Sequence, residues 1–117
     1  MDTKTLTIGV ASLDEVKRRM KAAFRGKADG TARLTFTSAA DMARALTPTR
    51  WDILTAMTGT GPIGVRELAR RVERDVKGVH TDVHALALAG IVDRTRDGKF
   101  SFPYDTVDVR FELHAAA

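Results

Sequence analysis

Residues 65–90, VRELARRVERDVKGVHTDVHALALAG, decide the fold, because they read as two short helices joined by a tight turn. Apolar residues of the first helix recur at the spacing of one helix face: Val65, Leu68, Ala69 and Val72. The second helix has a similar stripe: Val76, Val79, Val83, Leu86 and Ala87. The link, Glu73 to Asp75, has about the length used in a helix-turn-helix. The stretch therefore predicts that motif.

The solvent face of the second helix is small, polar and basic if its apolar stripe faces inward. That face would present Lys77, Gly78, His80, Thr81 and His84. Asp75 is suited to the N-cap, where its carboxylate accepts hydrogen bonds from free amides of the first turn. Such a face fits a DNA groove, so the residues predict a DNA-binding domain.

Length and composition set the bounds of this interpretation. The 117 residues suffice for one compact domain with an appendage, and 44% hydrophobic with 29% charged residues is typical of a globular protein. The absence of cysteine excludes disulfides and thiolate zinc sites. No apolar run reaches the roughly 18 residues that span a bilayer, and the N-terminus lacks a signal-peptide pattern. We therefore expect no membrane partner and a cytoplasmic location.

The net charge of +4 is concentrated toward the N-terminus. Residues 1–46 carry nine Lys and Arg against five Asp and Glu, whereas residues 105–117 carry one against three. A modest positive field favours polyanions, but charge alone does not identify nucleic acid as the partner.

The first 37 residues predict a strand–helix–strand extension. Residues 3–10 and 33–37 alternate as half-buried strands, and Ser12 with Glu15 forms a capping box that opens the helix between them. An apolar stripe of that helix is expected to be buried: Leu13, Val16, Met20, Ala23 and Phe24. Its opposite face is basic over residues 17–25. If the strands share a sheet, a parallel pair with a right-handed crossover is expected. We assign residues 1–37 to dimerisation or partner binding.

Residues 38–117 predict a winged helix-turn-helix domain with a C-terminal strand. A helix starts near Ser38, and a second follows Thr47 and Pro48, a residue suited to the first helical position. After Gly90, two short strands flank Asp97-Gly98, a strong hairpin signal. Residues 107–113 then alternate as a strand that needs the N-terminal strands or a second copy as its partner. The predicted class is α+β, with the extension appended to the winged domain.

Three segments also carry a family resemblance: LTPTRWDIL at 46–54, residues 65–92, and DGKFSFPYD at 97–105. They resemble a family of winged helix-turn-helix transcriptional regulators related to the MarR type. Some members of that family are antitoxins paired with toxins of the TumE type, which implies binding to a toxin and to the operator of its own operon. The chain departs from the usual pattern at Gly64, Gly78 and Thr81, where serine, asparagine and arginine are common. The last two departures remove side chains from the reading face, so base specificity should differ.

The predicted interface has three parts, with residues 76–89 entering the major groove. Base edges are approached by Lys77, His80, Thr81 and His84. Phosphates are held at helix starts by Arg50, Arg66 and Arg74. The tip of the hairpin lies along the backbone or minor groove through Arg94, Arg96 and Lys99. Lys77→Ala and Arg74→Ala are expected to weaken operator binding with little change in melting temperature. A homodimer would read two half-sites.

These residues also admit other interpretations. His80 and His84 have an i, i+4 spacing that can bind zinc, but Asp82 points elsewhere on the helical wheel, so no metal or cofactor is predicted. For Asp82 a bond to a neighbouring arginine is favoured over base contact. No phosphate loop or activated nucleophile occurs, so no enzyme is predicted. The alternative function is a protein-binding module that neutralises a toxin through the basic helix 13–25, with weak or no DNA binding.

Overall fold

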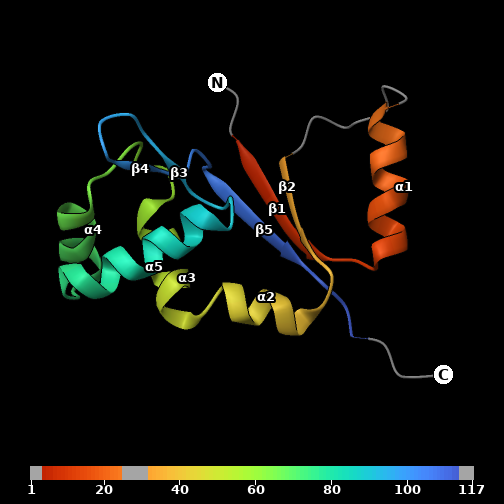
Figure 1. Cartoon of the computed structure of the whole chain (residues 1–117), viewed down its shortest axis with the longest axis horizontal. Helices are drawn as coiled ribbons and strands as arrows, with labels where there is room; N and C mark the ends of the chain where they lie inside the picture. Colours follow the sequence, from red (N-terminus) through yellow and green to blue (C-terminus); the bar gives the residue numbers. More distant parts are fainter. Residues whose placement is uncertain (1–3, 25–31, 114–117) are drawn as a thin grey trace. The chain divides into compact units, whose positions relative to one another are not determined.

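Residues 65–90 form the two predicted helices in the computed structural model, which describes residues 4–24 and 32–113. Helix α4 spans Val65–Val72 and helix α5 spans Val76–Leu88 (Figure 1). The chain turns between them at Glu73, which ends α4 in the left-handed conformation with φ 56°. The carboxylate of Asp75 accepts a 2.9 Å hydrogen bond from the amide of Gly78. The predicted turn and N-cap are both confirmed.

Helix α3, Pro48–Met57, packs against α4 and α5, and a two-stranded ribbon follows them. Strands β3, Asp93–Arg94, and β4, Phe100–Ser101, pair antiparallel around Gly98, whose φ of 83° suits the turn. A bridge between Ile63 and Phe100 ties the segment before α4 to this hairpin. The core of these elements is apolar: Leu46, Ile53, Leu54, Met57, Ile63, Leu68, Ala69, Val79, Val83, Leu86, Ile91, Val92, Phe100 and Phe102.

The predicted apolar stripe of α5 begins later than expected. Val79, Val83 and Leu86 are buried, but Val76 is 41% exposed. Val76 is the first residue of the helix, one turn before Val79, where burial begins. Its inclusion in the buried stripe was therefore wrong.

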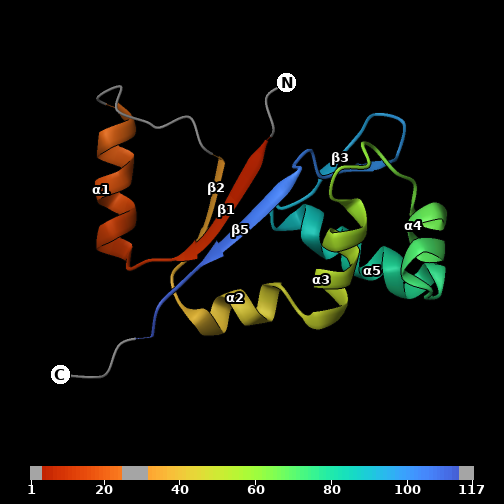
Figure 2. The same ribbon diagram turned by 180° about the vertical axis from the view of Figure 1, so that it is seen from behind.

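A three-stranded sheet with the order β2-β1-β5 forms the second group of elements. Strands β1, Thr5–Val10, and β2, Ala32–Phe36, pair in parallel, as predicted. In the register of this pair, Ile8 lies opposite Leu34. Strand β5, Thr106–Arg110, lies beside β1 and runs in the same direction (Figure 2). The C-terminal strand therefore pairs with an N-terminal strand. It ends at Arg110, earlier than the predicted residue 113.

Two helices belong to the same group as this sheet. Helix α1 spans Leu13–Phe24 and helix α2 spans Ala39–Ala45. The expectation that Leu13 is buried was wrong, since it is 60% exposed at the first position of α1. The side chains at 19–24 and residue 25, which include part of the predicted apolar stripe and basic face, lie outside the described residues.

Contacts divide the chain into two units whose boundaries differ from the expected division after residue 37. One unit comprises residues 1–4 and 45–106, and the other comprises residues 5–44 and 107–117. Two features explain the difference: β5 joins the sheet of β1 and β2, and residues 38–44 group with that sheet. Within the described residues, none of the helices is both long and apolar enough to cross a membrane.

Candidate nucleic-acid interface

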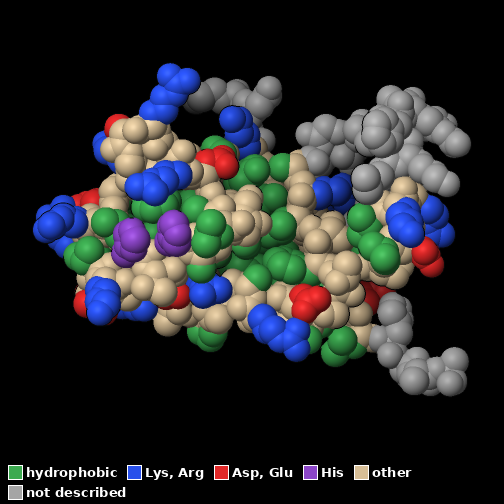
Figure 3. Space-filling model, in the orientation of Figure 1, with side chains coloured by type: hydrophobic (Ala, Val, Ile, Leu, Met, Phe, Trp, Pro, Cys, Tyr) green, Lys and Arg blue, Asp and Glu red, His purple; other side chains and the backbone are tan. Residues whose placement is uncertain are grey.

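The solvent face of α5 carries the four side chains predicted to approach DNA bases. Lys77, His80, Thr81 and His84 are all exposed. The rings of His80 and His84 stack with centroids 5.8 Å apart and an interplanar angle of 8°. Figure 3 shows these two histidines, in purple, side by side at the surface. The Thr81 hydroxyl donates to the carbonyl oxygen of Lys77 at 3.0 Å, which fixes its rotamer and leaves its lone pairs toward solvent.

Asp82, the acidic residue of α5, lies away from this face and is bound by arginines. Its carboxylate accepts hydrogen bonds from Arg74 Nη1 at 2.9 Å, Arg50 Nε at 3.2 Å and Thr49 Oγ1 at 3.1 Å. Only 14% of the Asp82 side-chain surface is exposed. The prediction that Asp82 bonds a neighbouring arginine is confirmed. The cluster joins α3, the turn and α5, and it neutralises the carboxylate.

Arg50 and Arg74 therefore have a structural role that the sequence did not reveal. Arg50 is 23% exposed and also donates to the carbonyl oxygen of Ala45 at 3.2 Å, while Arg74 is 28% exposed. Both were predicted to hold phosphates at helix starts. Because Arg74 is paired with Asp82, Arg74→Ala should lower the melting temperature, which corrects the expectation that stability would hardly change.

Gly78 lies directly beneath the Arg74 guanidinium. A Cβ atom at this position would come within 3.0 Å of Arg74 Nη2 and of the Asp75 carboxylate. The resemblance placed asparagine here, and a side chain at this position would need Arg74 Nη2 and the Asp75 carboxylate to shift by a few tenths of an ångström. Glycine at this position leaves the Arg74 guanidinium and the Asp75 carboxylate undisturbed.

The pKa of Asp82 is lowered in the folded protein. Burial alone would raise it, but hydrogen bonds from Arg74, Arg50 and Thr49 outweigh that effect. Because the pKa is lower in the folded state than in the unfolded state, the ionised carboxylate stabilises the fold. This contribution is fully present above the ordinary aspartate pKa of about 3.9, and it is lost as the pH falls through the folded-state pKa.

Comparison of the wild type with Asp82→Asn should show this pH dependence. We expect the difference in unfolding free energy between the two proteins to be largest above about pH 5. It should shrink in more acidic solution, where the carboxyl group of Asp82 is neutral in both the folded and the unfolded state. Urea unfolding at a series of pH values measures it. A difference that stays constant from neutral to strongly acidic pH would contradict a role for the charge.

Of the three arginines predicted to hold phosphates, only Arg66 is exposed. Arg66 lies in the first turn of α4, and no ion pair to it is found within the described part of the chain. The other two arginines of α4, Arg70 and Arg71, are both paired with Glu67. These hydrogen bonds and charges lower the pKa of Glu67. Arg66 is therefore the arginine of α4 best placed to meet a phosphate.

The hairpin tip is less basic than expected. Arg94, Arg96 and Lys99 are exposed, but Asp97 lies among them. A hydrogen bond from the Thr95 hydroxyl lowers the pKa of Asp97, which like an ordinary aspartate is ionised at neutral pH. The Thr95 hydroxyl also accepts from the Lys99 amide at 3.0 Å and closes the turn. The tip therefore carries three cations and one anion.

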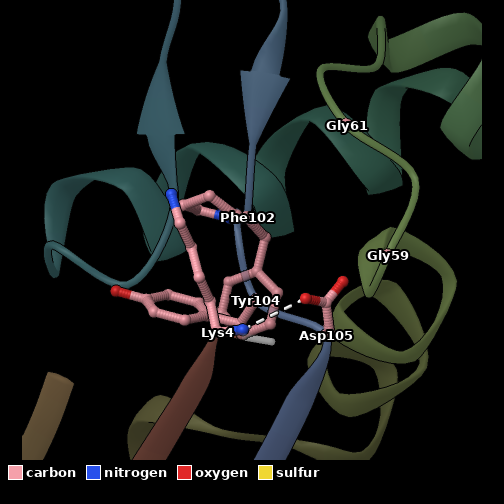
Figure 4. Close-up of a pocket in the computed structure, with 7 residues that line it drawn as sticks. Lys4, Gly59, Gly61, Phe102, Tyr104 and Asp105 are labelled. Carbon is pink, nitrogen blue, oxygen red and sulfur yellow. Dashed lines mark hydrogen bonds between the residues drawn. The ribbon is translucent and has the colours of Figure 1, made fainter. Parts of the chain in front are cut away.

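A surface pocket of about 240 Å³ lies elsewhere in the same unit. It is lined by Gly59 and Gly61, the segment 102–105 and Lys4, whose backbone amide donates to the Asp105 carboxylate at 3.1 Å (Figure 4). Its volume is below the roughly 300–1,000 Å³ of typical ligand sites. Neither this pocket nor a second one of about 340 Å³ beside Asp52, Thr55 and Arg71 is lined by a residue that was predicted to contact DNA. No cluster of three or more potential metal ligands is found among the described residues, so His80 and His84 gain no third ligand there.

The described residues form an α+β fold of helices and small sheets. A family model with the description HVO_A0114 matches residues 45–109, which is more than half of the chain. The chain therefore belongs to the HVO_A0114 family. The matched segment begins where the unit containing α3, α4, α5 and the hairpin begins, and it extends into β5. No curated protein matches the chain.

Proposed function

We propose that the protein is a sequence-specific DNA-binding transcriptional regulator and that residues 45–106 act as a winged helix-turn-helix. The observation that carries this proposal is the division of charge on α5. Its exposed face presents Lys77, His80, Thr81 and His84, while Asp82 is turned away and paired with two arginines. This separation favours contact with a polyanion, because a carboxylate on the exposed face would repel phosphates.

The order of elements supports the winged interpretation. Helix α3 is followed by the bridging residue Ile63, then by α4 and α5, and finally by a hairpin that returns to the bridge at Phe100. In helix-turn-helix proteins the second helix of the pair enters the major groove. In this protein that helix is α5, and the hairpin next to it is the wing.

In this mechanism the two arginines bound to Asp82 position α5 and leave the contacts with DNA to other side chains. Thr81, His80 and His84 reach base edges, where hydroxyl and imidazole groups can donate or accept hydrogen bonds. Lys77, Arg66 and the cations of the hairpin tip lie along phosphates and fix the orientation of the helix. The family resemblance further suggests that the target is the operator of its own operon.

The proposal is tested by fluorescence anisotropy with short duplexes that tile the region upstream of the protein's own reading frame. We expect one duplex to bind at least about 10³-fold more tightly than a scrambled duplex of equal composition. Its log affinity should fall linearly with log salt, with a slope of roughly −0.9 for each phosphate neutralised. Equal affinity for all duplexes, or no binding at low salt, would contradict the proposal. Co-purification with the product of the adjacent gene, without any DNA binding, would instead favour the toxin-neutralising alternative.

A further inference from the structure

Two large apolar side chains are exposed in the described part of the unit that contains residues 45–106, and both lie on α5. Val76, the first residue of the helix, is 41% exposed, and Leu88, the last residue, is 77% exposed. Single exposed apolar residues are common on protein surfaces, so the position of each on the helix decides what it can do. In the major groove of DNA, the apolar group that a base pair presents is the C5 methyl group of thymine.

The two ends of α5 differ in how well they suit a polyanion. Val76 lies at the positive end of the helix dipole, next to the exposed Lys77. The carboxylate of Asp75, which precedes it, already accepts a hydrogen bond from the Gly78 amide at 2.9 Å. Leu88 lies at the negative end of the dipole, about 18 Å away along the helix axis. The end that carries Val76 is therefore the end that DNA attracts.

Val76 also lies in line with side chains that the proposed function sets against base edges. Val76, His80 and His84 follow one another at intervals of four residues, so they form a row along the exposed face of α5. The stacked rings of His80 and His84 occupy the next two positions of this row. In helix-turn-helix proteins the first residues of the recognition helix contact base edges. The start of this row is therefore a position from which a side chain can contact a base.

We propose that Val76 contacts the C5 methyl group of a thymine and thereby specifies one base pair of the operator. The inference rests on the proposed function, because it requires α5 to lie in the major groove. A valine side chain has neither a donor nor an acceptor, so it discriminates through apolar contact alone. Against cytosine it would displace water from the N4 amino group without replacing the hydrogen bond, which is unfavourable. Thymine is therefore the base that Val76 favours.

Replacing thymine by deoxyuracil tests this contact in the full chain, because it removes the methyl group and leaves base pairing intact. The probe is the duplex from the upstream region that binds most tightly, with each thymine replaced in turn. Uracil at the contacted position should weaken wild-type binding about fourfold, the effect of leaving one methyl group in water. In Val76→Ser, which removes both γ methyl groups, the same replacement should have little effect.

Leu88→Ser is the matched control, because it removes an exposed apolar side chain at the opposite end of α5. This variant should keep the full effect of uracil. Both variants should melt close to the wild type, since neither side chain belongs to the core.

The possible results separate this inference from the proposed function. If wild-type affinity is unchanged by uracil at every thymine, the contact is refuted, while sequence-specific binding itself still stands. An equal effect of uracil on the wild type and Val76→Ser would also overturn the inference, because a different residue would then contact the methyl group. Equal affinity for all duplexes would instead refute the proposed function, and the inference with it.

Discussion

Replacing Asp82 by alanine is expected to lower the free energy of unfolding by about 2 kcal/mol. The variant leaves Arg50 and Arg74, both largely buried, without the carboxylate that they share. It also removes the acceptor of the Thr49 hydroxyl. Removal of one partner from such a cluster costs more than the pair contributes, because the remaining charges stay partly desolvated. Urea unfolding followed by circular dichroism measures the loss.

Glu67→Ala is the matched control for this experiment. Glu67 also pairs with two arginines, Arg70 and Arg71, but these side chains are 79% and 45% exposed. Ion pairs in contact with solvent contribute little, because water and salt screen them. We therefore expect Glu67→Ala to cause only a small part of the loss seen for Asp82→Ala. Equal losses in the two variants would show that burial of the Asp82 cluster does not matter for stability.

Replacing Lys77 by glutamate is expected to weaken DNA binding about tenfold or more. The change puts a negative charge on the face of α5 that the proposed function sets against phosphates. The slope of log affinity against log salt should also become shallower by about 0.9, which is the contribution of one phosphate contact. The fold should be retained, because Lys77 is exposed in the first turn of α5, where a glutamate interacts favourably with the helix dipole.

Arg70→Glu makes the same change in charge outside the proposed interface. Arg70 lies in the last turn of α4 and is 79% exposed. If binding depended only on net charge, both variants would weaken it equally. The proposed interface predicts a clearly larger effect for Lys77→Glu in anisotropy titrations with the same duplex. An unchanged affinity for Lys77→Glu would remove the start of α5 from the interface.

Much of the local structure followed from local sequence patterns. Apolar spacing located α4 and α5, Asp75 marked the start of α5, and Asp97-Gly98 marked the hairpin. These signals depend on residues within one helical turn or one β-turn, whose conformational preferences act at short range. The weakest expectations lay at helix starts, where Val76 and Leu13 fit an apolar stripe but remain exposed. Periodicity shows which face a residue belongs to, but it does not show how far packing extends along that face.

The candidate site was only partly predictable. Exposed groups on α5 could be read from the helical wheel, and so could the preference of Asp82 for an arginine. The partners themselves could not, because Arg50 lies 32 residues from Asp82 and Arg74 lies before the helix begins. The room that Gly78 gives to Arg74 was likewise invisible, since the sequence showed only a missing side chain.

The sequence by itself determined the helices, the turn, the hairpin and the polar face of α5, because each follows from the periodicity and capping of neighbouring residues. Only the tertiary structure decided that β5 pairs with β1 and that Arg50 and Arg74 hold Asp82. Strand pairing and ion pairs join groups distant in the chain. Their choice depends on which backbone edges and charges the folded chain brings within a few ångströms.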